Sequence, residues 1–88
     1  MQTFTIYIGS NNETGELELE RITSIAARQH LAFTVMTATG HWRGTEEETA
    51  VLVISDEPWR VQVTIAALKE ELNQEAIGYQ QSPNIEIA

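Results

Sequence analysis

The chain has 88 residues, 42% of them hydrophobic and 20% charged, and a chain of this length builds a single core, which excludes multi-domain and repeat architectures. Thirteen acidic residues against five basic ones give a formal charge of -8, which makes duplex nucleic acid an unfavourable partner. The absence of cysteine excludes disulfides, zinc thiolates, iron–sulfur clusters and thiol nucleophiles.

The first third of the chain predicts a strand, a loop and a helix. Residues 2–8 alternate between apolar and polar side chains, which is typical of a strand with one buried face. Residues 9–15 are rich in Gly, Asn and Ser and predict a loop. Apolar residues then recur at helical spacing over 16–30, with glutamates early and basic residues late, which suits a helix dipole. We expect His30 to be a capping cation at the end of this helix.

The middle of the chain predicts two strands with a long connection. Residues 32–39 are rich in β-branched and aromatic side chains, which favours a strand. Residues 40–48 contain two glycines and an acidic run, so we expect a solvated connection there. Residues 49–55 include a continuous apolar run, which predicts a strand at the centre of its sheet.

The last third predicts a helix and a final strand. Asp56 is expected to cap a helix over 58–72, in which apolar side chains follow one another four, three and four residues apart. Asn73 is a plausible helix terminator, and 76–81 can supply the last strand. We therefore expect one domain over 1–82 and a tail over 83–88, with pairing of that tail to a sheet edge left open.

The element order β-α-β-β-α-β predicts an α+β, ferredoxin-like fold: a four-stranded antiparallel sheet in the order 4-1-3-2, with both helices on one face. This connectivity brings Asn11, Asn12, Trp42, Arg43 and Gln74 to one rim of the molecule. The other face of the sheet has no cover within the chain. We expect a second subunit to cover it, and hence a homo-oligomer.

The residues around this rim predict a site for a small ligand. An indole offers a stacking plane, a guanidinium binds phosphate, and glycines let backbone amides approach a ligand. Asn11 and Asn12 can read a base or a ribose. The expected ligand-binding residues are Tyr7, Gly9, Asn11, Asn12, His41, Trp42, Arg43 and Gly44. The alternative is structural: Trp42 packs over the sheet edge, Arg43 neutralises the glutamates at 46–48, and the asparagines only form a turn.

Three segments of the chain, 4–9, 33–44 and 51–54, resemble a family of small uncharacterised bacterial and phage domains. That family pairs a strand ending Tyr-x-Gly with a Thr-Val-x-x-Ala-x-Gly-x-Trp-Arg strand and loop, and Tyr7, Gly9, Gly40, Trp42 and Arg43 match the shared pattern. The resemblance implies a ferredoxin-like fold. Many family members look like exported lipoproteins, whereas this chain shows neither a signal sequence nor a lipidation cysteine. We therefore expect a phage-type member located in the cytoplasm, that of the host if a phage encodes it.

These observations predict a non-enzymatic, homo-oligomeric protein that binds a small anionic, nucleotide-like ligand. One phage-type use is to sequester a nucleotide-derived immune signal. We expect no metal, since His41 with Glu46 or Glu48 matches no metal-ligand spacing, and no catalytic serine, since none lies in a nucleophile elbow. We also expect no cofactor, and no membrane partner, because the longest apolar run, residues 50–54, is too short to span a bilayer. Two alternatives stay open. One is a small enzyme of the dimeric α+β barrel type, with His41 or a glutamate of 46–48 as acid or base. The other is an adaptor that presents its acidic segment 16–20 to a basic partner.

Overall fold

The computed structural model describes residues 1–11, 13–74 and 76–82. In chain order its elements are β1 (Gln2–Gly9), α1 (Leu19–Ala27), β2 (Thr34–Trp42), β3 (Thr45–Asp56), α2 (Pro58–Glu71) and β4 (Gly78–Ser82). Within these described residues, no helix is long and apolar enough to cross a membrane. The tail over 83–88, for which an added edge strand was left open, lies outside the described residues.

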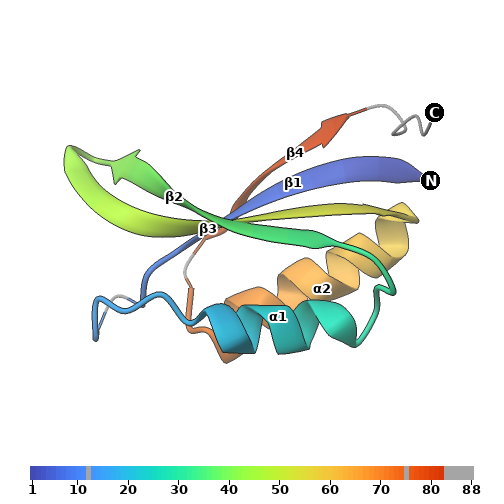
Figure 1. The fold of residues 1–88 in the computed structure, drawn as a ribbon, viewed down its shortest axis with the longest axis horizontal. Helices are drawn as coiled ribbons and strands as arrows, with labels where there is room; N and C mark the ends of the chain where they lie inside the picture. The colour runs from blue at the N-terminus through green and yellow to red at the C-terminus, as the bar shows by residue number, and fades with distance from the viewer. Residues whose placement is uncertain (12, 75, 83–88) are drawn as a thin grey trace.

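The four strands form one sheet in the order β2-β3-β1-β4, and every neighbouring pair is antiparallel. Both helices lie on one face of the sheet (Figure 1). The predicted α+β, ferredoxin-like fold is confirmed, including its strand order and the central place of the apolar third strand. The directions of the strands in this topology also fix which loops share one end of the molecule.

The core lies between the sheet and the two helices. Alternate side chains of β1 and β3 face the helices, in the register pairs Phe4↔Ile54, Ile6↔Leu52 and Ile8↔Ala50, and all of them are fully buried. The helices contribute the buried side chains Ile22, Ile25, Ala26, Val61, Ile65, Leu68 and Leu72. The two-residue period of the strands therefore divides the sheet into a buried face and a face that no helix covers.

The expected solvated connection over 40–48 is wrong, because most of it is a β-hairpin. β2 continues to Trp42 and β3 begins at Thr45, so that only Arg43 and Gly44 form the turn. Both turn residues have positive φ, 50° and 79°, as in the two-residue turn that matches the twist of a hairpin. The hairpin extends beyond the last register pair of β1, Gly9↔Thr49 (Figure 1).

The expected roles of His30 and Asp56 as helix caps are also wrong. The His30 side chain is buried, its Nδ1 lies 2.7 Å from Asp56 Oδ2, and its Nε2 lies 2.7 Å from Thr64 Oγ1. A carboxylate only accepts, so Nδ1 donates to it. Asp56 Oδ1 accepts from the Glu57 amide, and Glu57 is the N-cap of α2, without a side-chain cap bond. The two hydrogen bonds of His30 therefore join the chain after α1 to the end of β3 through Asp56 and to α2 through Thr64.

This arrangement makes the stability of the fold depend on pH. Partial burial raises the pKa of the Asp56 carboxyl, but the hydrogen bonds from His30 and the Glu57 amide and the charges of His30 and Arg60 outweigh it, so the pKa lies below its ordinary value. A carboxyl with a lowered pKa stabilises the fold above the pKa of the unfolded chain, about 3.9. That stabilisation is lost as the pH falls through the folded value.

We therefore expect Asp56→Asn to lower the free energy of unfolding by about 1.5–3 kcal/mol at pH 7, the range for a hydrogen bond to a charged group. Urea unfolding of both proteins from pH 7 to pH 2 measures the effect. The difference between wild type and variant shrinks on acidification, because the wild-type carboxylate is then protonated. A difference that stays constant from pH 7 to pH 2 would contradict this role of the Asp56 charge.

Candidate functional site

A cavity of about 590 Å³ lies where the β2–β3 hairpin, the end of β1 and the connection from α2 to β4 meet. It is lined by Tyr7, Gly9 and Ser10, by Gly40, His41, Trp42, Arg43, Glu47 and Thr49 of the hairpin, and by Gln74 and 76–78. This volume is within the range typical of small-molecule sites. A smaller hollow of about 260 Å³ between α1 and α2 contains the ion pair of Arg28 and Glu71, which leaves the hairpin cavity as the better candidate.

Two glycines keep this cavity open on the helix-free side of the sheet. A Cβ atom on Gly9 would lie 2.9 Å from Glu47 Oε1, and a Cβ on Gly40 would overlap Thr49 Oγ1. Neither glycine has a positive φ, so the requirement is one of space and not of backbone conformation. The floor of the cavity is therefore formed by bare backbone, with one carboxylate and one hydroxyl next to it.

The two glycines differ in the neighbour that a methyl group would meet. We expect Gly40→Ala to destabilise the fold by about 1–3 kcal/mol, the usual cost of overpacking, because the β-branched Thr49 side chain is stiff. Gly9→Ala is the matched control. Its methyl group meets the end of the flexible Glu47 side chain, which can swing away.

Thermal unfolding of the two variants checks this contrast. Thr49→Ala introduced together with Gly40→Ala removes the overlapping hydroxyl and recovers part of the stability. Equal melting temperatures for Gly40→Ala and wild type would show that the hairpin adjusts freely and that Gly40 is not needed for space.

Trp42 and Arg43 form the charged and aromatic end of the cavity. Trp42 is 63% exposed, and the guanidinium carbon of Arg43 lies 5.6 Å from the centre of the indole ring, a cation–π distance. Among the described residues, no carboxylate lies within ion-pair distance of Arg43. The alternative in which Arg43 neutralises the glutamates of the hairpin is therefore not supported by an ion pair in the described chain.

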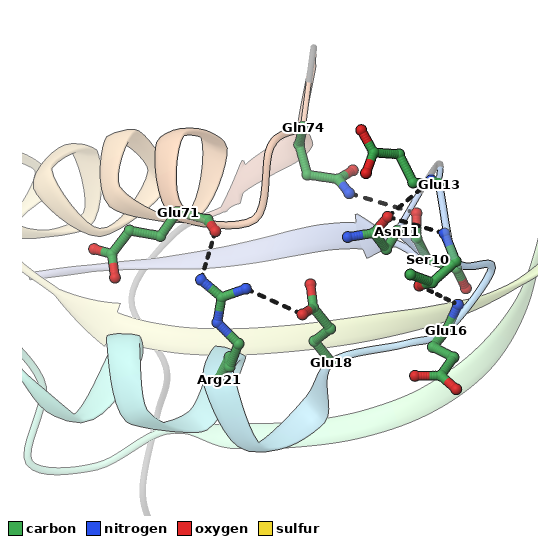
Figure 2. Close-up of polar contacts among 9 residues, drawn as sticks. Ser10, Asn11, Glu13, Glu16, Glu18, Arg21, Glu71 and Gln74 are labelled. Atoms are coloured by element: carbon green, nitrogen blue, oxygen red, sulfur yellow. Dashed lines mark hydrogen bonds and ion pairs between the residues drawn. The ribbon is translucent and has the colours of Figure 1, made fainter.

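The loop after β1 is closed by its own hydrogen bonds (Figure 2). Asn11 Oδ1 accepts hydrogen bonds from the backbone amides of Glu13 and Thr14 at 2.8 and 3.2 Å, and the backbone N–H of Asn11 donates to the Glu16 carbonyl. The side chain of Asn11 thus builds a turn, as in the structural alternative, and it does not line the cavity. Asn12 lies outside the described residues.

Two side-chain contacts tie this loop to the rest of the rim. Ser10 Oγ donates to the Glu48 carbonyl at 2.8 Å. Gln74 Nε2 donates to the Ser10 carbonyl at 3.4 Å (Figure 2). They join the end of β1 to the hairpin and to the segment after α2. Gln74 follows Asn73, whose φ of 54° is the left-handed conformation expected of a helix terminator.

The structure brings together part of the predicted site. Tyr7, Gly9, His41, Trp42 and Arg43 line one cavity, and so does Gln74 of the predicted rim. Gly44 instead forms the hairpin turn and is not among the lining residues. The convergence of the hairpin with the segment after α2 follows from topology, as expected; that these residues bind a ligand stays a prediction.

Sequence reasoning missed Glu47 and Thr49 as lining residues. They alternate with the core positions Ala50, Leu52 and Ile54 of β3, so they lie on the same face of the sheet as Val51 and Val53. The signal was present: extending the two-residue period of 49–55 backwards through the acidic run places both side chains beside Gly9 and Gly40. The run of three glutamates led instead to the prediction of a solvated loop, because such a run is typical of one.

No family model matches this sequence, and no curated protein matches it. Solved structures do. A DUF3240 family protein from Shewanella baltica OS155 is 13% identical, with 99% of this chain and 93% of that chain covered and a TM-score of 0.70. CutA1 from Oryza sativa is 12% identical, with coverage of 100% and 84% and a TM-score of 0.62. The de novo designed protein Foldit4 is 16% identical, with 96% of both chains covered and a TM-score of 0.56. At these identities the likeness shows the fold alone.

Proposed function

We propose that this protein binds a small, anionic, nucleotide-like ligand in the hairpin cavity and holds it without chemical turnover. The observation that carries the proposal is the conformation of Arg43. Its φ of 50° is in the left-handed region, where glycine and asparagine are common and arginine is disfavoured. The hairpin turn requires this φ, and asparagine would adopt it with less strain than arginine does. Binding of an anion at a cavity beside an exposed indole would explain why an arginine occupies the position.

The lining side chains favour a ligand with three chemical parts. The exposed face of Trp42 suits a planar base, since base–aromatic stacking accepts any base. The Arg43 guanidinium suits a phosphate group. The Glu47 carboxylate repels phosphate and accepts hydrogen bonds, so it suits ribose hydroxyls or the amino group of a base. A bare anion satisfies only one of these residues, whereas a nucleotide satisfies all three.

The proposal includes a biological use and an assembly state. The resemblance to phage domains supports sequestration of a nucleotide-derived immune signal in the host cytoplasm, which needs tight binding and an intact ligand. The binding form is proposed to be a homo-oligomer, because the cavity opens on the side of the sheet that no helix covers.

Two measurements on one sample test this function. Native mass spectrometry of the purified protein reports any small molecule that co-purifies, and isothermal titration with ADP-ribose, cyclic dinucleotides and mononucleotides measures affinity. We expect saturable binding of at least one of these ligands. After long incubation with the protein, mass spectrometry should detect that ligand chemically unchanged. No binding across the panel would contradict the proposal, and a new product would favour the alternative in which His41 acts as an acid or base.

A further inference from the structure

The face of the sheet opposite the helices is almost free of charge. Its side chains alternate with the buried positions of β1 and β3, and the register assigns the matching positions of β2 and β4 to it. They are Thr, Ser, Val, Met, Tyr, Ala, Gln and Gly apart from the hairpin end. Glu47 in the hairpin is the only charged one among the described residues. In a chain with 18 acidic and basic residues, charge is therefore strongly segregated away from this face.

The remaining charges of the described chain lie away from this face. They are on α1 and α2, in the segments before and after α1, at the junction of β3 and α2, and in the hairpin. A basic protein partner would be attracted to that acidic surface and would gain nothing from the neutral face. Two copies of a chain with a net charge of -8 repel each other in most orientations. They can approach closely where both present uncharged side chains.

The helix-free face has about the area of a small stable interface. Its strands contain 8, 9, 12 and 5 residues, which at about 3.4 Å per residue and about 4.8 Å between strands cover roughly 550 Å². This is close to the lower end of the roughly 600–1,000 Å² that a standard interface buries on each partner. In the described part of the chain, apolar surface on this face stays exposed: Met36 is 48% exposed, Tyr7 is exposed, and Val51 and Val53 are half-buried. Figure 1 shows both helices on one side of the sheet, and no other element of the described residues lies over the opposite side.

We infer that two copies of the chain pack through these helix-free faces, sheet against sheet, to form a homodimer. The inference deepens the proposed homo-oligomer by naming its surface and its stoichiometry. It also bears on the cavity: Tyr7, Gly9, Gly40 and Glu47 belong to the same face, so the partner's sheet closes the side of the cavity that is open in one chain. Ligand binding thus depends on the dimer.

Light scattering after size-exclusion chromatography tests the interface. Wild type elutes with the mass of two chains. Val51→Glu and Met36→Glu each place two like charges in the contact, and we expect either variant to raise the dimer dissociation constant by about 100-fold or more. Val63→Glu is the matched control: Val63 is 45% exposed on α2, and its replacement leaves the dimer intact. Circular dichroism verifies that all variants fold.

Two outcomes overturn the inference: a wild-type protein that is monomeric at tens of micromolar, or variants at Val51 and Met36 that keep the wild-type mass. The second outcome is the one expected if copies pair through the free edge of β2 instead. Titration of the ligand panel into Val51→Glu separates this inference from the proposed function. A wild-type dimer that binds no ligand leaves the interface established and removes the function, whereas equal binding by wild type and the monomeric variant shows that the cavity needs no partner.

Discussion

Replacing Trp42 by alanine is expected to weaken binding of the nucleotide-like ligand about 5- to 150-fold, because stacking of one base on an aromatic side chain contributes about 1–3 kcal/mol. The indole is largely exposed and is not part of the core, so the fold is expected to keep its stability within about 0.5 kcal/mol. Isothermal titration gives the affinity, and urea unfolding gives the stability.

The chain contains a closely matched control for this variant. Trp59 is 61% exposed, and Arg60 lies over its ring at 5.1 Å, much as Arg43 lies over Trp42. It belongs to α2 and does not line the hairpin cavity. Trp59→Ala should therefore leave the affinity unchanged. Equal losses in the two variants, or no loss in either, would show that the Trp42 indole does not stack on the ligand.

Replacing Arg43 by asparagine is expected to change stability and affinity in opposite directions. Asparagine tolerates the left-handed conformation, so the free energy of unfolding should rise by about 0.5–1 kcal/mol. Affinity should fall about 10- to 150-fold, since a hydrogen bond to a charged group contributes about 1.5–3 kcal/mol. Urea unfolding and isothermal titration of the same preparation measure both effects.

Arg60→Asn serves as the control for the lost charge, since Arg60 is a helix residue away from the cavity. It should not change the affinity. An Arg43→Asn variant that is less stable than wild type would show that the arginine side chain, and not a ligand, accounts for its unusual conformation. Unchanged affinity would remove Arg43 from the site.

The fold could be predicted because the periodic segments are unambiguous. The alternation of 2–8 and the four-three-four spacing within 58–72 each match one element, and the order of elements leaves one common topology. The error in the hairpin has a local cause. A two-residue turn with positive φ is signalled by Asn-Gly, and here the residues are Arg43-Gly44. Without that signal, the adjacent acidic run resembled a loop.

The site could be predicted only as far as topology determines it. The meeting of the hairpin with the segment after α2 follows from the direction of each strand. The state of an individual side chain does not: Asn11 can read a ligand or close a turn, and only its hydrogen bonds to Glu13 and Thr14 decide between these. Similarly, the hydrogen bond between His30 and Asp56 joins residues 26 positions apart, and no local sequence pattern predicts such a long-range contact.

The central claim is that the hairpin cavity holds the ligand through Trp42. The chain has two tryptophans, so a ¹⁵N-correlated NMR spectrum contains two indole N–H signals, which Trp42→Ala and Trp59→Ala assign. Titration with ADP-ribose and cyclic dinucleotides should move the Trp42 signal saturably and leave the Trp59 signal in place. A Trp42 signal that stays fixed across the panel, or a ligand that moves only Trp59, would contradict the claim.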